Sequence, residues 1–180
     1  MKPYVFKCKI QMIKTHPIIR LPEELSQALP SRGMVMGRIE ILGFEVVLPL
    51  EPDGRGGHWL ELSPEAMSHI DKSYESQPIG DILIQLSVES DWLRPDLPQD
   101  LHHALVHHHV TQSWQTLTPK AQWQWLRWIR FTQNPNTRSK RIMTTCSMLS
   151  SGKTRPCCFD QTRCTVTDVS KSGILLEPTD

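Results

Sequence analysis

The stretch WQTLTPKAQWQWLRWIR, Trp114–Arg130, is the part of the sequence around which the chain is organised. Its Thr118-Pro119 pair suits the start of a helix, because a hydroxyl can cap the first turn and proline needs no N–H partner there. In the residues that follow, Ala121, Trp125 and Ile129 recur on one helical face. The stretch therefore predicts an amphipathic helix with a tryptophan-rich buried side.

The charge distribution around this helix is uneven. Residues 101–159 contain 8 Lys and Arg and no Asp or Glu, so the segment charges are −5 for residues 1–100, +8 for residues 101–159 and −2 for residues 160–180. Such asymmetry indicates an anionic partner, or one half of the molecule packing on the other. A solvated helical face that lacks acids by chance is the alternative.

The candidate binding residues come from this basic segment, and they are Trp123, Arg127, Arg130, Arg138, Lys140 and Arg141. An indole one or two turns from guanidinium groups can stack on them, or can offer a platform for a nucleic acid base. Packing against the rest of the protein is the alternative for these side chains. The cations at 138–141 also stand at the start of a predicted helix, where the helix dipole disfavours them, so an acidic patch or an external anion is expected to compensate.

The first hundred residues predict a small β-domain with an internal repeat. Leu21-Pro22-Glu23 and Ser63-Pro64-Glu65 each follow a strand, start a short helix and lead through a glycine-containing turn to another strand. Two such units favour a pseudo-twofold barrel, because each half-sheet needs the other to bury its apolar face. The glycine-rich turn at 51–57 is interpreted as a hairpin loop and not as a phosphate cradle, since no Lys-Ser/Thr pair follows it.

The expected elements can be given by range. Strands are predicted at residues 4–13, 18–21, 34–41, 44–50, 59–62 and 82–88, and helices at 22–29, 63–70, 98–108, 118–132 and 137–149. The predicted domains are a β-barrel over 1–92, a helical region over 93–155 and an irregular, cysteine-containing tail over 156–180. The fold class is therefore α+β, with the helices after the barrel.

The cysteines and histidines leave the metal question open. Five cysteines without a secretory signal predict thiols in the cytoplasm, and no apolar run reaches membrane-spanning length. The spacing of Cys157, Cys158 and Cys164 makes them weak zinc candidates, with a redox-labile tail as the alternative. His103 and His107 have the helical spacing of a metal clasp, but exposed helix histidines are the preferred interpretation. No cofactor is expected.

The order of several short motifs resembles the YdeI/OmpD-associated, or bacteriocin-protection, family. The matching residues are Leu21-Pro22-Glu23, Gly37, the Gly54–Gly57 turn, Gly80-Asp81, Leu97-Pro98-x-Asp100-Leu101-x-x-Ala104-Leu105, Trp128-Ile129 and Thr137-Arg138-x-x-Arg141-Ile142. The resemblance covers roughly residues 4–153 and implies a double-split barrel similar to AbrB and MazE proteins. It brings no reaction, cofactor or catalytic residue, and this chain lacks the acids that usually accompany the bases in the family's helices.

The expected function is that of a non-enzymatic binding or stress-protection protein. Its basic helical face would engage an anionic partner, either nucleic acid or an acidic protein. A protein-interaction module with a metal- or redox-responsive cysteine tail is one alternative. An enzyme with a dispersed active site is another, although no nucleophile-elbow, zinc-protease or nucleotide-binding motif is present.

Overall fold

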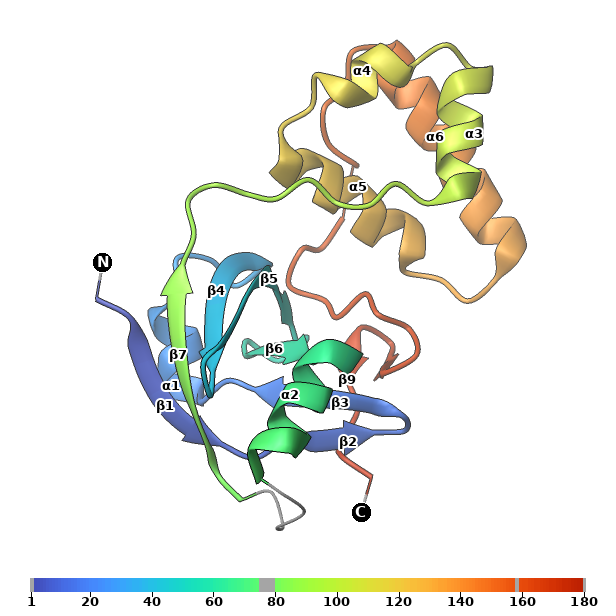
Figure 1. The fold of residues 1–180 in the computed structure, drawn as a ribbon. Helices are drawn as coiled ribbons and strands as arrows, with labels where there is room; N and C mark the ends of the chain where they lie inside the picture. The colour runs from blue at the N-terminus through green and yellow to red at the C-terminus, as the bar shows by residue number, and fades with distance from the viewer. Residues whose placement is uncertain (1, 75–79, 158, 180) are drawn as a thin grey trace. The chain divides into compact units, whose positions relative to one another are not determined.

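The computed structural model describes residues 2–74, 80–157 and 159–179 of the chain. The chain divides into two compact units. The sheet unit contains residues 1–91, 161–164 and 169–180, and the helical unit contains residues 92–160 and 165–168. Strands dominate the first unit and helices the second (Figure 1), which confirms the predicted α+β class.

Among the described residues, seven strands form one antiparallel sheet in the order β1-β7-β4-β5-β6-β3-β2. The strands are β1 (Tyr4–Cys8), β2 (Gln11–Ile13), β3 (His16–Arg20), β4 (Val35–Ile41), β5 (Phe44–Pro52), β6 (His58–Glu61) and β7 (Ile82–Val88). The sheet curls like part of a barrel (Figure 1), and Ile19, Ile39 and Ile84, each 0% exposed, lie in the core that it encloses.

The predicted repeat is present in the order of the elements. In the first copy β3 leads into α1 (Glu23–Ala28) and then β4, and in the second β6 leads into α2 (Pro64–Tyr74) and then β7. Both helices start at a Pro-Glu pair, with Glu23 or Glu65 in the first turn. A carboxylate is favourable there because the helix dipole is positive at that end.

The single strand predicted over residues 4–13 is wrong, because two strands occupy this range. β1 pairs with β7, whereas β2 pairs with β3, so the two lie at opposite ends of the strand order. The alternation of apolar residues continues across Lys9 and Ile10, where no strand is present. A period of two shows that a segment is extended, but it does not show which strand is its partner.

The helical unit contains α3 (Gln99–His107), α4 (Thr111–Gln115), α5 (Pro119–Arg130) and α6 (Pro135–Ser150). The predicted face of α5 is confirmed, since Ala121, Trp125 and Ile129 are buried in the core of this unit. Thr118 caps α5 through Ala121 N–H, and Asn134 caps α6 by accepting N–H bonds from Asn136 and Thr137. The short helix α4 was not predicted. No helix of the described residues is both long and apolar enough to cross a membrane.

The last residues of the chain return to the sheet unit. They form a small hairpin, β8 (Ser170–Lys171) and β9 (Ile174–Leu175), where an irregular tail was expected. Leu175 N–H donates to Asp53 O at 2.8 Å, and Thr179 N–H donates to Met12 O at 2.8 Å. These bonds hold the C-terminal segment, defined here as residues 169–179, along the sheet unit beside β2 and β3 (Figure 1).

Candidate functional site

The six predicted binding residues lie on α5 and α6, and most of them already contact other groups of the helical unit. Trp123 Nε1 donates to the backbone oxygen of Leu93 at 2.9 Å. This bond holds the indole edge against the linker that precedes α3. An indole fixed in this way supports the helical unit, which was the alternative stated for this side chain.

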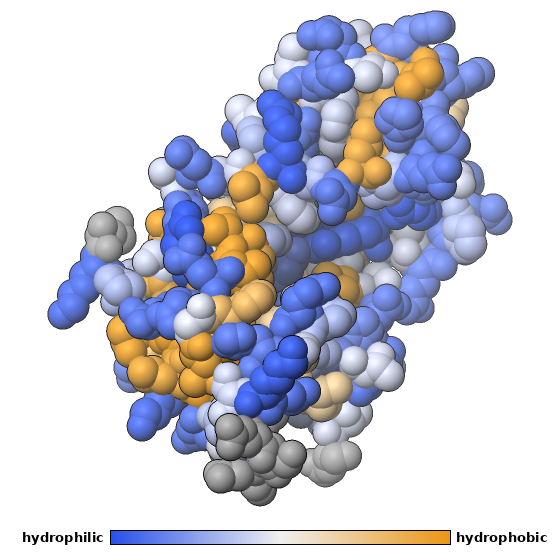
Figure 2. Space-filling view, viewed as in Figure 1, coloured by the Kyte–Doolittle hydropathy of each residue, from blue (hydrophilic) through white to orange (hydrophobic). Residues whose placement is uncertain are grey.

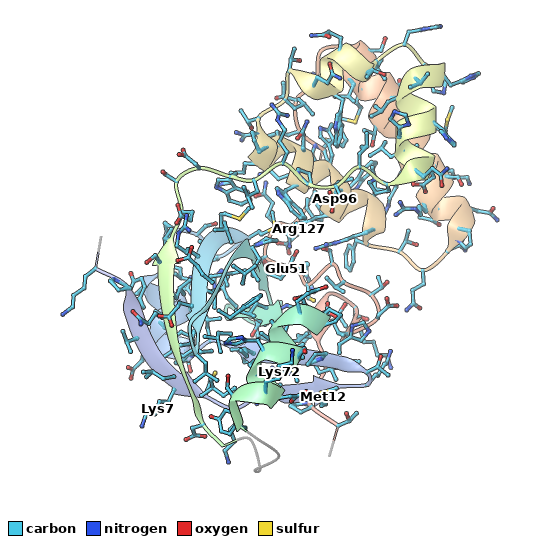
Figure 3. The ribbon with its side chains drawn as sticks, in the orientation of Figure 1. Lys7, Met12, Glu51, Lys72, Asp96 and Arg127 are labelled. Carbon is cyan, nitrogen blue, oxygen red and sulfur yellow. The ribbon has the colours of Figure 1, made fainter. Side chains whose placement is uncertain are left out.

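Arg127 and Arg130 each contact a residue of the helical unit that lies far along the chain from α5. Arg127, labelled in Figure 3, is 1% exposed, and its guanidinium carbon lies 5.6 Å from the centroid of the Phe159 ring. Arg130 Nε donates to Thr165 Oγ1 at 2.9 Å. The aromatic partner of Arg127 is therefore Phe159, which lies far along the chain, and not the nearby indole that the sequence suggested.

Arg138 forms an ion pair with Asp100, at the start of α3. Arg138 Nε lies 2.7 Å from Asp100 Oδ2, and its Nη2 lies 3.0 Å from Oδ1. The hydrogen bond from Arg138 holds the pKa of Asp100 below its ordinary value. Two parallel bonds make this the geometry in which a guanidinium binds a carboxylate best.

Arg141 satisfies the end of the preceding helix. Its Nη1 donates to the backbone oxygens of Trp128 and Phe131 at 2.6 and 2.7 Å, and its guanidinium carbon lies 5.5 Å from the centroid of the Trp128 ring. Desolvation by burial lowers the pKa of Arg141. The carbonyl groups at a helix C-terminus carry partial negative charge and attract cations. The dipole conflict predicted at the start of α6 is thus offset by Asp100 and by the end of α5.

Lys140 is the exposed member of the six, since Arg127 is buried and the other four are partly buried. The structure therefore does not bring the six together as one open surface. Five of them have a contact within the helical unit, and the Lys140 side chain is exposed.

A surface hollow lies between α3 and α6 in the helical unit. It has a volume of about 650 Å³, and we call it the α3–α6 face; its lining includes Ala104, Val106 and Met143 with His102, His103 and His107. Val106 is 51% exposed and Met143 is 50% exposed. The hydropathy view shows a strip of hydrophobic surface among hydrophilic residues in this unit (Figure 2).

Part of this face is predictable from the sequence. The histidines of α3 were predicted to be exposed, and His102, His103 and His107 are. Val106 and Met143 were missed because each falls outside the apolar stripe of its own helix. An apolar residue off the buried stripe can mark a contact surface, but only the pairing of α3 with α6 shows that these two share one hollow.

The cysteine candidates show no metal geometry in the part of the chain that the structure describes. Cys157 is exposed, Cys164 is buried in the sheet unit, and Cys158 lies outside the described residues. Within the described ranges, no group of three His, Cys, Asp or Glu side chains is arranged to hold a metal ion. The proposal of zinc at this tail gains no support from geometry.

The described elements define an α+β protein. One unit contains a curled antiparallel sheet, and the other contains four helices among its described residues. Residues 94–152, in the helical unit, match the model of the family described as Bacteriocin-protection, YdeI or OmpD-Associated. The resemblance stated from the motifs is confirmed for this segment. No curated protein matches the chain in a sequence search.

Proposed function

We propose that this is a non-enzymatic binding protein whose helical unit engages an anionic protein segment through the α3–α6 face. The observation that carries the proposal is an exposed apolar hollow in a segment that has no acidic residue from 101 to 159. Large exposed apolar side chains such as Val106 and Met143 often mark interaction sites. Charge complementarity then favours an acidic, amphipathic partner.

An acidic protein segment fits this face better than nucleic acid does. Nucleic acid interfaces depend on lysine and arginine reaching phosphates and on aromatic rings free to stack. Arg138 and Arg141 are instead bonded within the unit, and the Trp123 indole is held by Leu93. Thioether and valine side chains beside imidazoles are better suited to the apolar face of a peptide helix.

We also propose a more specific fold for the sheet unit. The two strand–helix–strand units, β3-α1-β4 and β6-α2-β7, support a double-split barrel related to AbrB and MazE proteins. We also propose a cytoplasmic location, a compartment in which cysteines remain reduced as thiols. The family name associates some members with bacteriocin protection, which agrees with a role in stress protection through protein contacts.

The test is a fluorescence-anisotropy titration of the full chain. The probes are a labelled amphipathic peptide with glutamates on one face and leucines on the other, and single- and double-stranded DNA and RNA oligonucleotides, each at low and physiological salt. We expect saturable binding of the peptide. The double variant Val106→Glu with Met143→Glu should weaken it at least about tenfold, or about 1.4 kcal/mol, because it places carboxylates where the acidic partner docks.

The matched control is the double variant Val5→Glu with Leu83→Glu, since these residues are 57% and 48% exposed and lie on β1 and β7 in the sheet unit. It adds the same charge at a similar exposure, and peptide binding should not change. Equal loss in both variants would mean that overall charge, and not this face, determines binding. Binding of oligonucleotides alone, with affinity that falls steeply as salt rises, would replace the acidic protein by nucleic acid as partner.

A further inference from the structure

A second surface feature lies in the sheet unit and is independent of the function proposed above. It is a groove of about 370 Å³ whose polar lining is formed by Arg20, Glu23, Arg32, Asp53, Arg55 and His58. These residues come from β3, α1, β6 and the loops at 29–34 and 53–57. Three guanidinium groups from three separate segments therefore converge on one cavity.

The turn at 53–57 is built so that its backbone and Arg55 keep a fixed position. Asp53 Oδ1 accepts the N–H groups of Arg55 at 2.7 Å and Gly57 at 2.9 Å, and Asp53 N–H donates to Gly57 O at 3.0 Å. Arg32 Nη1 donates to Gly56 O at 3.1 Å, which fastens a second arginine to the same turn. The carboxylate of Asp53 therefore accepts hydrogen bonds from the backbone of its own loop.

A carboxylate of the chain already lies at the edge of this groove. Glu177, in the C-terminal segment, places Oε1 2.9 Å from Arg55 Nη1 and Oε2 3.6 Å from Arg20 Nη2. Arg20 Nη2 also donates to the backbone oxygen of Leu176. The Glu177 side chain is 64% exposed, so an ion pair at this position contributes little and can be exchanged for another anion.

Two buried polar atoms of the groove add an independent observation. Arg20 Nε and His58 Nδ1 have no hydrogen-bond partner among the described residues. His58 is 1% exposed, and its Nε2 lies 2.9 Å from Gly33 O, so this nitrogen carries the proton that is donated. Burial lowers the pKa of His58, and because Nε2 donates to Gly33 O, Nδ1 of the neutral ring is an acceptor. A buried polar atom without a partner calls for an explanation.

We propose that this groove binds a small oxyanion that also carries a hydroxyl group, with Arg20 and Arg55 binding the anionic oxygens and His58 Nδ1 accepting the hydroxyl proton. Glu177 occupies the anion position in the absence of such a ligand and is displaced when the ligand binds. Hydroxycarboxylates and hydrogen phosphate share the required chemistry. A guanidinium pair suits either group, because arginine binds carboxylate and phosphate oxygens in a bidentate manner.

The experiment is a titration of the full chain followed through backbone amide chemical shifts at constant ionic strength. The probes are two pairs that differ in the hydroxyl group: citrate with tricarballylate, and inorganic phosphate with sulfate. We expect saturable shifts at Arg55, Gly56 and Gly57. The hydroxyl-bearing member of a pair should bind about tenfold more tightly, because a buried acceptor is left without a partner by a ligand that cannot donate to it. The pair that binds more tightly identifies the ligand as a carboxylate or a phosphate.

The variants separate the arginine site from general charge effects. Arg55→Gln should weaken binding at least about tenfold, since a charge-assisted bond is lost. Glu177→Gln should strengthen it about two- to fivefold, in proportion to the worth of an exposed ion pair. Arg38→Gln is the control, because Arg38 pairs with Glu45 and Glu89 on the same sheet, away from the groove lining, and should not alter affinity.

Several results would overturn the proposal. In the ligand titrations, these are shifts that do not saturate, or equal affinities within both ligand pairs. In the variants, they are unweakened binding in Arg55→Gln, or affinity that does not rise in Glu177→Gln. Arg55 and Glu177 are 60% and 64% exposed, so neither variant is expected to disturb folding. If the groove does not bind an oxyanion, the function proposed for the α3–α6 face is not affected, because the two sites belong to different units.

Discussion

Arg138 and Asp100 join the first turns of α6 and α3 through two parallel hydrogen bonds, Nε to Oδ2 at 2.7 Å and Nη2 to Oδ1 at 3.0 Å. The pair fixes two helices whose exposed sides form the α3–α6 face. It also explains how a helix can begin with cations, because the carboxylate that compensates them comes from another helix and not from the same turn.

The Arg138–Asp100 pair should make the helical unit sensitive to acid. A carboxyl group whose pKa is depressed in the folded state contributes stability above its unfolded pKa, about 3.9, and loses it as the pH falls through the folded value. Both side chains are partly exposed, so Asp100→Asn should lower the free energy of unfolding at pH 7 by about 0.5–1 kcal/mol. Urea denaturation at a series of pH values should show this difference shrinking below pH 3.9. Asp96→Asn, in the exposed linker, is the control; a difference for Asp100→Asn that stays constant down to the lowest pH would contradict the ion pair.

Arg141 should be required as arginine. Its guanidinium reaches two carbonyl groups at the end of α5 and covers the Trp128 ring, which a lysine cannot do in one geometry. We expect Arg141→Lys to lower the free energy of unfolding by about 1–2 kcal/mol. Lys140→Arg, the exposed neighbour, should change it by less than about 0.5 kcal/mol. Equal effects of the two exchanges in urea denaturation would refute the capping role of Arg141.

Gly54 should be intolerant of a side chain because the C-terminal segment lies against it. A Cβ at Gly54 would come 2.1 Å from Gly173 O, whereas a Cβ at Gly43 would meet nothing within 4 Å, although both residues have positive φ, +84° and +82°. Gly43→Ala should cost about 1 kcal/mol from backbone strain alone. Gly54→Ala should cost more and should speed hydrogen exchange at the Leu175 amide, which bonds to Asp53 O. The same exchange rate at Leu175 in both variants would show that the segment is not held at this turn.

Cys8 and Cys146 should resist alkylation in the folded protein. Burial, with a smaller contribution from Asp81, raises the pKa of the Cys8 thiol to about 11, and burial also raises the pKa of Cys146. The thiolate is the nucleophile, so little of either residue is reactive at pH 7.5. Iodoacetamide labelling mapped by mass spectrometry should modify both only after denaturation. Rapid labelling of Cys8 in the native protein would mean that β1 opens readily at the edge of the sheet.

The elements were predictable where local chemistry decides them. Thr118-Pro119 and the Pro-Glu pairs start helices through interactions within a few residues, and the α5 face followed from its spacing. The split of residues 4–13 into β1 and β2 was not predictable, because strand partners are set by long-range pairing. The contact partners of the basic residues were not predictable for the same reason. Arg138 meets Asp100 and Arg127 meets Phe159 only after the chain has folded.

The two proposed sites differ in how much of each is predictable from the sequence. The exposure of the α3 histidines is predictable. Val106 and Met143 each lie off the apolar stripe of their own helix, and only the pairing of α3 with α6 brings them to one face. The groove residues Arg20, Arg32 and Arg55 are separated by strands and a helix, and Glu177 comes from the end of the chain. No spacing within one segment points to them. The turn at 51–57 has the sequence of a hairpin loop, and only the folded sheet brings it close to Arg20 and Arg32.

We propose that the helical unit contacts an acidic partner at the α3–α6 face, and amide chemical-shift mapping of the full chain tests this proposal. We predict that the amphipathic glutamate–leucine peptide shifts amides at 102–107 and 140–144, and that these shifts saturate together with the anisotropy signal. Shifts confined to other parts of the chain during saturable binding, or no binding of the peptide at low salt, would contradict the claim.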